Sequence, residues 1–104
     1  MTTLEKLEAT IAARKTSAPE SSYTAKLLSQ GPEKCAKKFG EEAFELAMAA
    51  VLNNKTNTTN EAADVLYHFL VLLQSADVKL SEVMSVLEKR EGTSGLMEKA
   101  NRNG

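Results

Sequence analysis

Apolar residues recur along most of this chain at the three- and four-residue intervals that place them on one face of an α-helix. Leu4, Leu7 and Ile11 keep this spacing at the start of the chain. The motif Thr2-x-x-Glu5 has the form of a capping box, in which each residue satisfies a backbone N–H group of the other. Together these features predict a first helix over residues 3–15.

Turn-forming residues divide the rest of the chain into further helical segments. Gly31 and Pro32 mark the end of one helix and the first turn of the next, and Ser81 is the expected cap of the last helix. The predicted elements are a linker at 17–22, a brief helix at 23–30, a long helix at about 32–53, a hairpin loop at 53–60, a second long helix at about 58–76 whose regular part begins at Glu61, and a last helix ending near Glu91.

The second long helix contains a run, residues 65–73, that is apolar on nearly every side. A helix of this kind has to be covered all round, and a chain of 104 residues offers few helices to cover it. We therefore expect a homodimer, or a higher homo-oligomer, that packs through the helix ending at residue 76.

Composition favours one all-α domain spanning residues 1–104, built as a bundle of four to five helices around the antiparallel pair. A formal net charge of -1 gives no footprint for nucleic acid or for a membrane surface. No stretch approaches the length of a membrane span, and Met1–Ala13 lacks the features of a signal peptide. Cys35 is the single cysteine, so we expect a cytoplasmic protein without disulfides.

Two acidic pairs, Glu42-x-x-Glu45 and Glu61-x-x-Asp64, occupy the two long helices, and Glu41 precedes the first pair. Residues three apart share a helix face. Carboxylates pressed together by antiparallel helices repel one another unless a cation joins them, and oxygen ligands suit Mg²⁺ or Mn²⁺. We expect the hairpin to place Glu45 nearer Asp64 or His68 than Glu61. The alternative is that Glu61 closes a capping box with Thr58.

Lysines gather where the first long helix begins, although the helix dipole disfavours cations there. Lys34, Lys37 and Lys38 lie in its first two turns, and Lys26 lies on the preceding short helix. A helix N-terminus with added lysines is a receptor for phosphate. The alternative is that Lys37 and Lys38 form ordinary surface ion pairs with Glu41 and Glu42.

The remaining reactive residue types are interpreted as packing residues. His68, the only histidine, lies in the apolar run and is expected to be a packed, hydrogen-bonded core residue. Cys35 is expected to be a small buried side chain. Tyr23 and Tyr67 could stack on a base or pack, and packing is favoured for Tyr67.

With these motifs assembled, the chain resembles the phosphoribosyl-ATP pyrophosphohydrolases of histidine biosynthesis. The pairs EExxE and ExxD are shared with the wider group of all-α nucleotide pyrophosphohydrolases of the MazG type. More particular segments are SYTAKLL at residues 22–28, GPEK at 31–34 and SGLxEK at 94–99. The resemblance covers nearly the whole chain and implies a MazG-like helical dimer.

The resemblance also implies Mg²⁺-dependent hydrolysis of phosphoribosyl-ATP to phosphoribosyl-AMP and pyrophosphate. It assigns metal ligands at Glu42, Glu45, Glu61 and Asp64, with Glu41 as an outer ligand or as the base for the attacking water. In the tail, Lys99 and Arg102 are expected to close over the substrate. Two rival hypotheses are a housecleaning NTP pyrophosphatase with the same carboxylates, and a non-catalytic helical dimerisation module.

Overall fold

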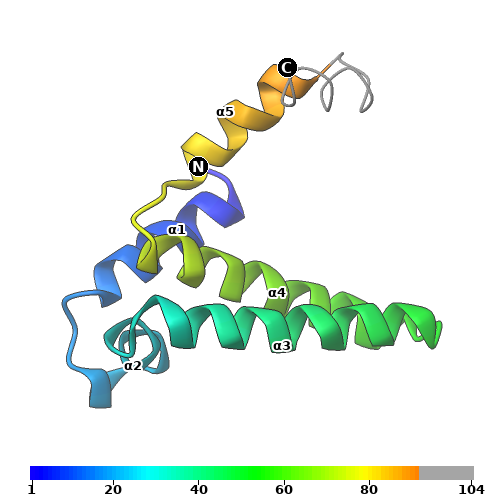
Figure 1. Cartoon of the computed structure of the whole chain (residues 1–104), viewed down its shortest axis with the longest axis horizontal. Coiled ribbons are helices and arrows are strands. Elements are labelled where there is room, and N and C mark those ends of the chain that lie inside the picture. Colours follow the sequence, from blue (N-terminus) through cyan, green and yellow to red (C-terminus); the bar gives the residue numbers. More distant parts are fainter. Residues whose placement is uncertain (92–104) are drawn as a thin grey trace.

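Two long antiparallel helices form the centre of the molecule (Figure 1). The computed structural model describes residues 1–91 and places α3 over Gly31–Val51 and α4 over Lys55–Ser75. These two helices share the most extensive contact between any two elements in that part of the chain. The predicted antiparallel pair is confirmed.

Three shorter helices complete the described fold: α1 over Thr3–Arg14, α2 over Tyr23–Ser29 and α5 over Leu80–Arg90. A 3-10 turn, Pro19–Ser21, lies in the segment predicted to be a linker. Residues 1–91 contain no strand, so the all-α prediction is confirmed. No helix among them has both the length and the apolar character that crossing a membrane requires.

The hairpin loop is shorter than predicted. Only Leu52–Asn54 separate the two long helices, so the expected loop at 53–60 and the expected helix start near residue 58 or 61 are wrong. Asn53 adopts a left-handed conformation with φ of 57°, which asparagine tolerates better than most residues. The Asn54 side chain caps α4 by accepting a hydrogen bond of 3.0 Å from the backbone N–H of Asn57.

The polar residues that suggested a long loop instead form the first turns of α4. Thr58 and Thr59 donate their hydroxyl hydrogens to backbone carbonyls one turn earlier, those of Asn54 at 2.7 Å and Lys55 at 3.0 Å. Because Asn54 is the N-cap, Thr58 cannot be one. The capping-box alternative for Glu61 is therefore wrong, and Glu61 lies inside the helix.

The hydrophobic core lies at the end of the hairpin that α1 and α2 cover (Figure 1). Its buried side chains are Ile11, Leu27, Cys35, Leu70, Val71 and Leu80. The apolar run of α4 is largely covered within this one chain, because Leu66 alone among residues 65–73 is classed as exposed. The apolar run of α4 therefore does not by itself require a second chain to cover it.

Exposed apolar side chains are found on α3 instead. Met48 follows Phe44 by four residues, and Val51 and Leu52 follow Met48 by three and four residues, where α3 ends at the hairpin loop. Phe44 is 66% exposed and Val51 76% exposed. We call these four residues the α3 apolar stripe. A row of large exposed apolar side chains along one helix points to an interaction surface, whereas single exposed ones are ordinary.

The termini of α1 and α5 show one confirmed and one wrong prediction. The capping box Thr2-x-x-Glu5 is present, with hydrogen bonds of 3.2 and 3.1 Å. Ser81, however, is not the cap of α5, which begins at Leu80. Its first N–H groups are satisfied by Glu82, from within the helix, and by Glu8 of α1, whose carboxylate accepts from the Leu80 N–H at 2.7 Å.

Candidate metal centre

The short hairpin loop sets which acidic residues face one another. Glu45 and Glu61 each lie eight residues from Asn53, and Glu42 and Asp64 each lie eleven residues from it. Antiparallel helices that turn at Asn53 therefore bring Glu45 level with Glu61. The expectation that Glu45 lies nearer Asp64 or His68 is wrong, because it assumed a turn centred several residues later.

Three carboxylates from α3 and α4 lie close together in this hairpin. Glu42, Glu45 and Glu61 each offer one oxygen, and these oxygens all lie within 4.8 Å of one another. Glu42 and Glu61 are half-buried, whereas Glu45 is exposed. We call these three residues the acidic triad. The triad contains three of the four residues that the resemblance assigns as metal ligands.

The other two acidic residues of the motifs lie at the edge of the triad. Asp64 is outside the 4.8 Å group, although its charge contributes to the raised pKa values of Glu42 and Glu61. Glu41 is exposed and forms an ion pair of 3.5 Å with Lys38. The alternative paired each lysine with the glutamate four residues later, Lys37 with Glu41 and Lys38 with Glu42, whereas the observed pair joins residues three apart.

Burial and the repulsion of neighbouring carboxylates disfavour ionisation of Glu42 and Glu61. Burial raises the pKa of Glu42, and the neighbouring Glu45, then Asp64 and Glu61, raise it further. Burial likewise raises the pKa of Glu61, with Glu45 and Asp64 adding to the shift. In addition, Oε2 of Glu61 is buried and has no hydrogen-bond partner within the described residues. A cation would satisfy this oxygen and offset the repulsion.

The triad fits a small divalent cation. Oxygens bound to one Mg²⁺ at 2.0–2.1 Å lie at most about 4.2 Å apart, so a limit of 4.8 Å requires only small side-chain adjustments. The donors are all carboxylate oxygens, which suit Mg²⁺ and Mn²⁺ rather than softer metals. Asp64, three residues after Glu61, and Glu41, directly before Glu42, flank the triad in sequence but lie outside this group of oxygens.

The raised pKa values predict how stability depends on pH. Without metal, the folded protein holds protons on Glu42 and Glu61 more tightly than the unfolded chain does, so their contribution to stability is present below the ordinary glutamate pKa of about 4.3 and is lost as pH rises through their raised pKa values. Bound Mg²⁺ requires ionised carboxylates. Thermal melting should therefore show a larger stabilisation by Mg²⁺ at pH 8 than at pH 5. Equal stabilisation at both values would contradict this expectation.

The four lysines do not form one cluster. Lys34 and Lys37 line a hollow of about 280 Å³ with Gln30 and Glu33 at the start of α3. Lys38 lies beside Glu41, and Lys26 is exposed on α2. At Gly31 the backbone has φ of +88°, a conformation that glycine adopts without strain. Two of the lysines thus line the hollow at the start of α3, whereas Lys38 lies beside Glu41 at the edge of the triad.

Tyr23, Tyr67 and His68 form an aromatic group, and His68 lies one helical turn after Asp64 on α4. His68 is buried, and its ring lies perpendicular to that of Tyr23, with centroids 6.4 Å apart. Burial, and secondly the Lys38 ammonium, lower the pKa of His68, whereas Asp64 and Glu41 act in the opposite direction. Its Nδ1 has no hydrogen-bond partner among residues 1–91. His68 is therefore packed as predicted, but the predicted hydrogen bonding of this atom is absent.

Tyr67 and Cys35 have structural surroundings. The Tyr67 hydroxyl forms a hydrogen bond with the hydroxyl of Thr24, which ties α2 to α4, and burial raises the pKa of Tyr67. Cys35 is 1% exposed, and its thiol donates to the Leu27 carbonyl at 3.4 Å. The packing predictions for both residues are confirmed.

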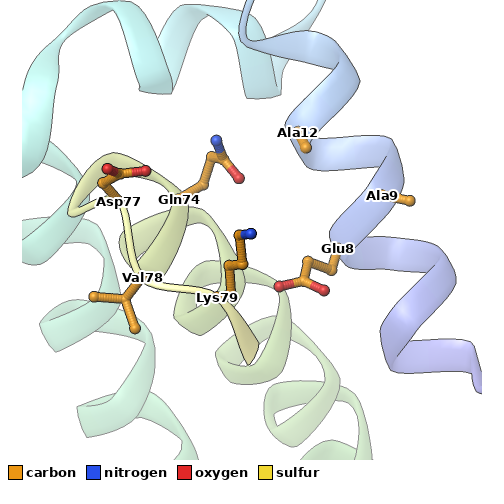
Figure 2. A pocket seen from close by; sticks show the side chains of 7 residues that line it. All are labelled: Glu8, Ala9, Ala12, Gln74, Asp77, Val78 and Lys79. Atoms are coloured by element: carbon orange, nitrogen blue, oxygen red, sulfur yellow. The ribbon is translucent and has the colours of Figure 1, made fainter. Parts of the chain in front are cut away.

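A separate cavity of about 300 Å³ lies between α1 and the connection from α4 to α5 (Figure 2). Glu8, Gln74, Asp77 and Lys79 supply its polar lining, and none of the predicted site residues contributes to it. Figure 2 shows the Glu8 carboxylate beside the Lys79 side chain, where α5 begins. Because Glu8 caps α5, this region has a clear structural role. Lys99, Arg102 and the SGLxEK segment lie outside the described residues.

An all-helical chain whose hairpin gathers carboxylates from both helices fits the class of all-α nucleotide pyrophosphohydrolases. A model of the phosphoribosyl-ATP pyrophosphohydrolase family matches residues 4–91. Curated relatives named phosphoribosyl-ATP pyrophosphatase include those of Cereibacter sphaeroides (62% identical) and Dinoroseobacter shibae (61% identical), which align over 98% of this chain and over 99% and 100% of their own lengths. The chain belongs to the phosphoribosyl-ATP pyrophosphohydrolase family.

Proposed function

We propose that this chain hydrolyses phosphoribosyl-ATP to phosphoribosyl-AMP and pyrophosphate, a step of histidine biosynthesis, with Mg²⁺ or Mn²⁺ at the acidic triad. The observation that carries the proposal is the meeting of three carboxylates from two helices in a chain of this family. The reaction consumes one water and breaks the phosphoanhydride bond between the α and β phosphates. We place it in the cytoplasm.

The triad, together with Asp64, would hold the cation and so determine where the triphosphate binds. A divalent ion at this site would offset the negative charge of the triphosphate and polarise phosphorus toward attack. Glu42, Glu45 and Glu61 are the ligands that the distances favour, and Asp64 binds or orients from the edge. Glu61 anchors the arrangement, because its buried Oε2 otherwise lacks a partner.

Glu41 and the lysines act around this centre. Glu41 is an outer ligand or accepts the proton of the attacking water, and its exposure leaves it accessible to that water. Lys38, 3.5 Å from Glu41, neutralises charge on phosphate oxygens near the triad. Lys34 and Lys37, in the hollow at the start of α3, bind phosphate farther from the reacting bond, and Lys26 contributes from α2.

We also infer that two copies of the chain form a homodimer through the α3 apolar stripe. Phe44, Val51 and Leu52 are each more than 60% exposed, and burying them against a second copy removes this apolar surface from water. One face that packs against itself across a two-fold axis closes the assembly at two. The stripe begins beside Glu41 and Glu45 in sequence, so the second copy would lie next to the site.

The proposed reaction is tested by measuring pyrophosphate release from phosphoribosyl-ATP beside a panel of ordinary and oxidised NTPs, with and without Mg²⁺. We expect Mg²⁺-dependent release with kcat/KM at least about a hundredfold higher for phosphoribosyl-ATP, because discrimination of this size needs only about 2.7 kcal/mol. Preference for an NTP would instead identify a housecleaning pyrophosphatase. The absence of release from every substrate, together with no thermal stabilisation by Mg²⁺, would identify a non-catalytic dimerisation module.

A further inference from the structure

Tyr23 is a large aromatic side chain that remains 55% exposed at the start of α2. The neighbouring apolar residues of the same helix, Ala25 and Leu27, are buried in the core. An exposed tyrosine is unremarkable by itself. Tyr23 differs because a buried residue of another helix holds its ring, and because charged groups of the candidate site lie beside it.

The ring of Tyr23 is held by His68 of α4. The two rings are perpendicular at 89°, with centroids 6.4 Å apart, which is a favourable arrangement for aromatic groups. His68 is only 6% exposed and makes a second edge contact with Tyr67 at 4.9 Å. The hydrogen bond between Thr24 and Tyr67 fixes α2 on α4 directly beside these rings. The orientation of Tyr23 is thus set by packing, while more than half of its surface stays open.

This open surface lies toward the edge of the candidate site, where Lys38, Glu41 and Asp64 are found. His68 follows Asp64 by one helical turn, about 6 Å along α4, and follows Glu61 by about 10 Å. The Lys38 ammonium lies close enough for the Tyr23 phenol to be the main influence that raises the pKa of Lys38, and it also pairs with Glu41. An extended nucleotide spans a comparable length between its base and its terminal phosphates. With the triphosphate at the triad, the base would reach the neighbourhood of Tyr23.

We propose that Tyr23 is the surface on which the purine ring of the substrate stacks, and that His68 is the positioning residue that orients it. The inference rests on the proposed function for the identity of the nucleotide. Stacking suits an exposed phenol ring because every base presents a π face. Tyr67 is not available for this role, since it is half-buried and its hydroxyl is bonded to Thr24.

The test compares Tyr23→Ala and Tyr23→Phe in steady-state assays with phosphoribosyl-ATP, using inorganic tripolyphosphate as a competitor that lacks a base. We expect Tyr23→Ala to raise KM about tenfold with little change in kcat, and Tyr23→Phe to retain the wild-type KM. Inhibition by tripolyphosphate should be the same in all three proteins. An unchanged KM in Tyr23→Ala would overturn the proposal, as would weaker inhibition by tripolyphosphate that matches the rise in KM.

The role of His68 is tested with the single variants Tyr23→Ala and His68→Ala and their double variant. If His68 acts by orienting Tyr23, His68→Ala raises KM by itself but adds nothing further in the Tyr23→Ala background. His68→Phe should restore part of the wild-type KM, because it keeps an aromatic edge against Tyr23. Independent, additive effects would assign His68 a general structural role and overturn this part of the proposal.

Calorimetric titration with phosphoribosyl-AMP separates failure of the inference from failure of the proposed reaction. If the wild-type protein binds this product but releases no pyrophosphate, the proposed function fails, and the affinity of Tyr23→Ala for the product still decides the stacking. Sedimentation of the same variants tests whether a second copy of the chain, rather than the substrate, covers Tyr23. A loss of self-association with unchanged product affinity would place Tyr23 in a protein interface and overturn the inference.

Discussion

Replacing Glu42 by glutamine is expected to lower Mg²⁺-dependent pyrophosphate release by at least about a hundredfold while leaving the helices intact. Glutamine keeps the shape of the side chain but cannot carry the negative charge that a divalent cation requires. Because Glu42 lies among Glu45, Glu61 and Asp64, removing its charge also relieves repulsion. The metal-free variant should therefore melt at a temperature equal to or above that of the wild-type protein, whereas its stabilisation by Mg²⁺ should largely disappear.

These opposite effects distinguish loss of a ligand from general damage to the fold. Circular dichroism reports the helices, and thermal melting with and without Mg²⁺ reports the site. Glu33→Gln is the matched control, since Glu33 lies on the same helix, is exposed and lies outside the acidic triad. It should keep the Mg²⁺-induced stabilisation. Unchanged Mg²⁺-dependent activity in Glu42→Gln would remove Glu42 from the site.

Replacing Val51 by glutamate is expected to convert a dimer into monomers, with the dissociation constant raised about a hundredfold or more. Val51 is 76% exposed within one chain, so a charge there costs little in the monomer. In an apolar interface the same carboxylate would lose water without gaining a partner, which is strongly unfavourable. Sedimentation velocity over a range of concentrations measures the change. Phe44 is 66% exposed and belongs to the same stripe, so Phe44→Glu should weaken the dimer in the same way.

Asn57→Glu is the control for this experiment, because Asn57 is exposed on α4 near the same hairpin loop but does not belong to the α3 apolar stripe. It should leave the dimer unchanged. A Val51→Glu variant that sediments as the wild-type protein does would refute the proposed interface. Loss of helicity in Val51→Glu would show instead that Val51 supports the fold of a single chain.

The helical hairpin could be predicted from the sequence because its signals are local and periodic. The length of its loop could not. Asn and Thr favour turns, but Thr58 and Thr59 also satisfy their hydroxyl groups against the preceding helical turn. Which of the two happens depends on the cap that Asn54 provides. The same polar residues allowed the alternative that Glu61 only closes a capping box, whereas Glu61 lies in the acidic triad with a buried oxygen that has no partner within the described residues.

Features that depend on contacts between distant segments were missed for a different reason. The cap of α5 comes from Glu8, which lies 72 residues before the amide that it binds. Tyr23 meets His68 only after α2 has packed on α4. The apolar run of α4 suggested an exposed interface, yet α1, α2 and α3 of the same chain cover most of it. No spacing rule within one helix reports such contacts.

The three-residue hairpin loop has a consequence for how this protein can change. Surface loops usually accept insertions and deletions more readily than helices do. Here the loop at Leu52–Asn54 fixes which residues of α3 and α4 stand opposite each other. One inserted residue carried into α4 would turn its acidic residues by about 100° relative to α3, and a second would turn them farther away. The loop can therefore vary in its residues, but its length is as much a part of the site as the carboxylates themselves.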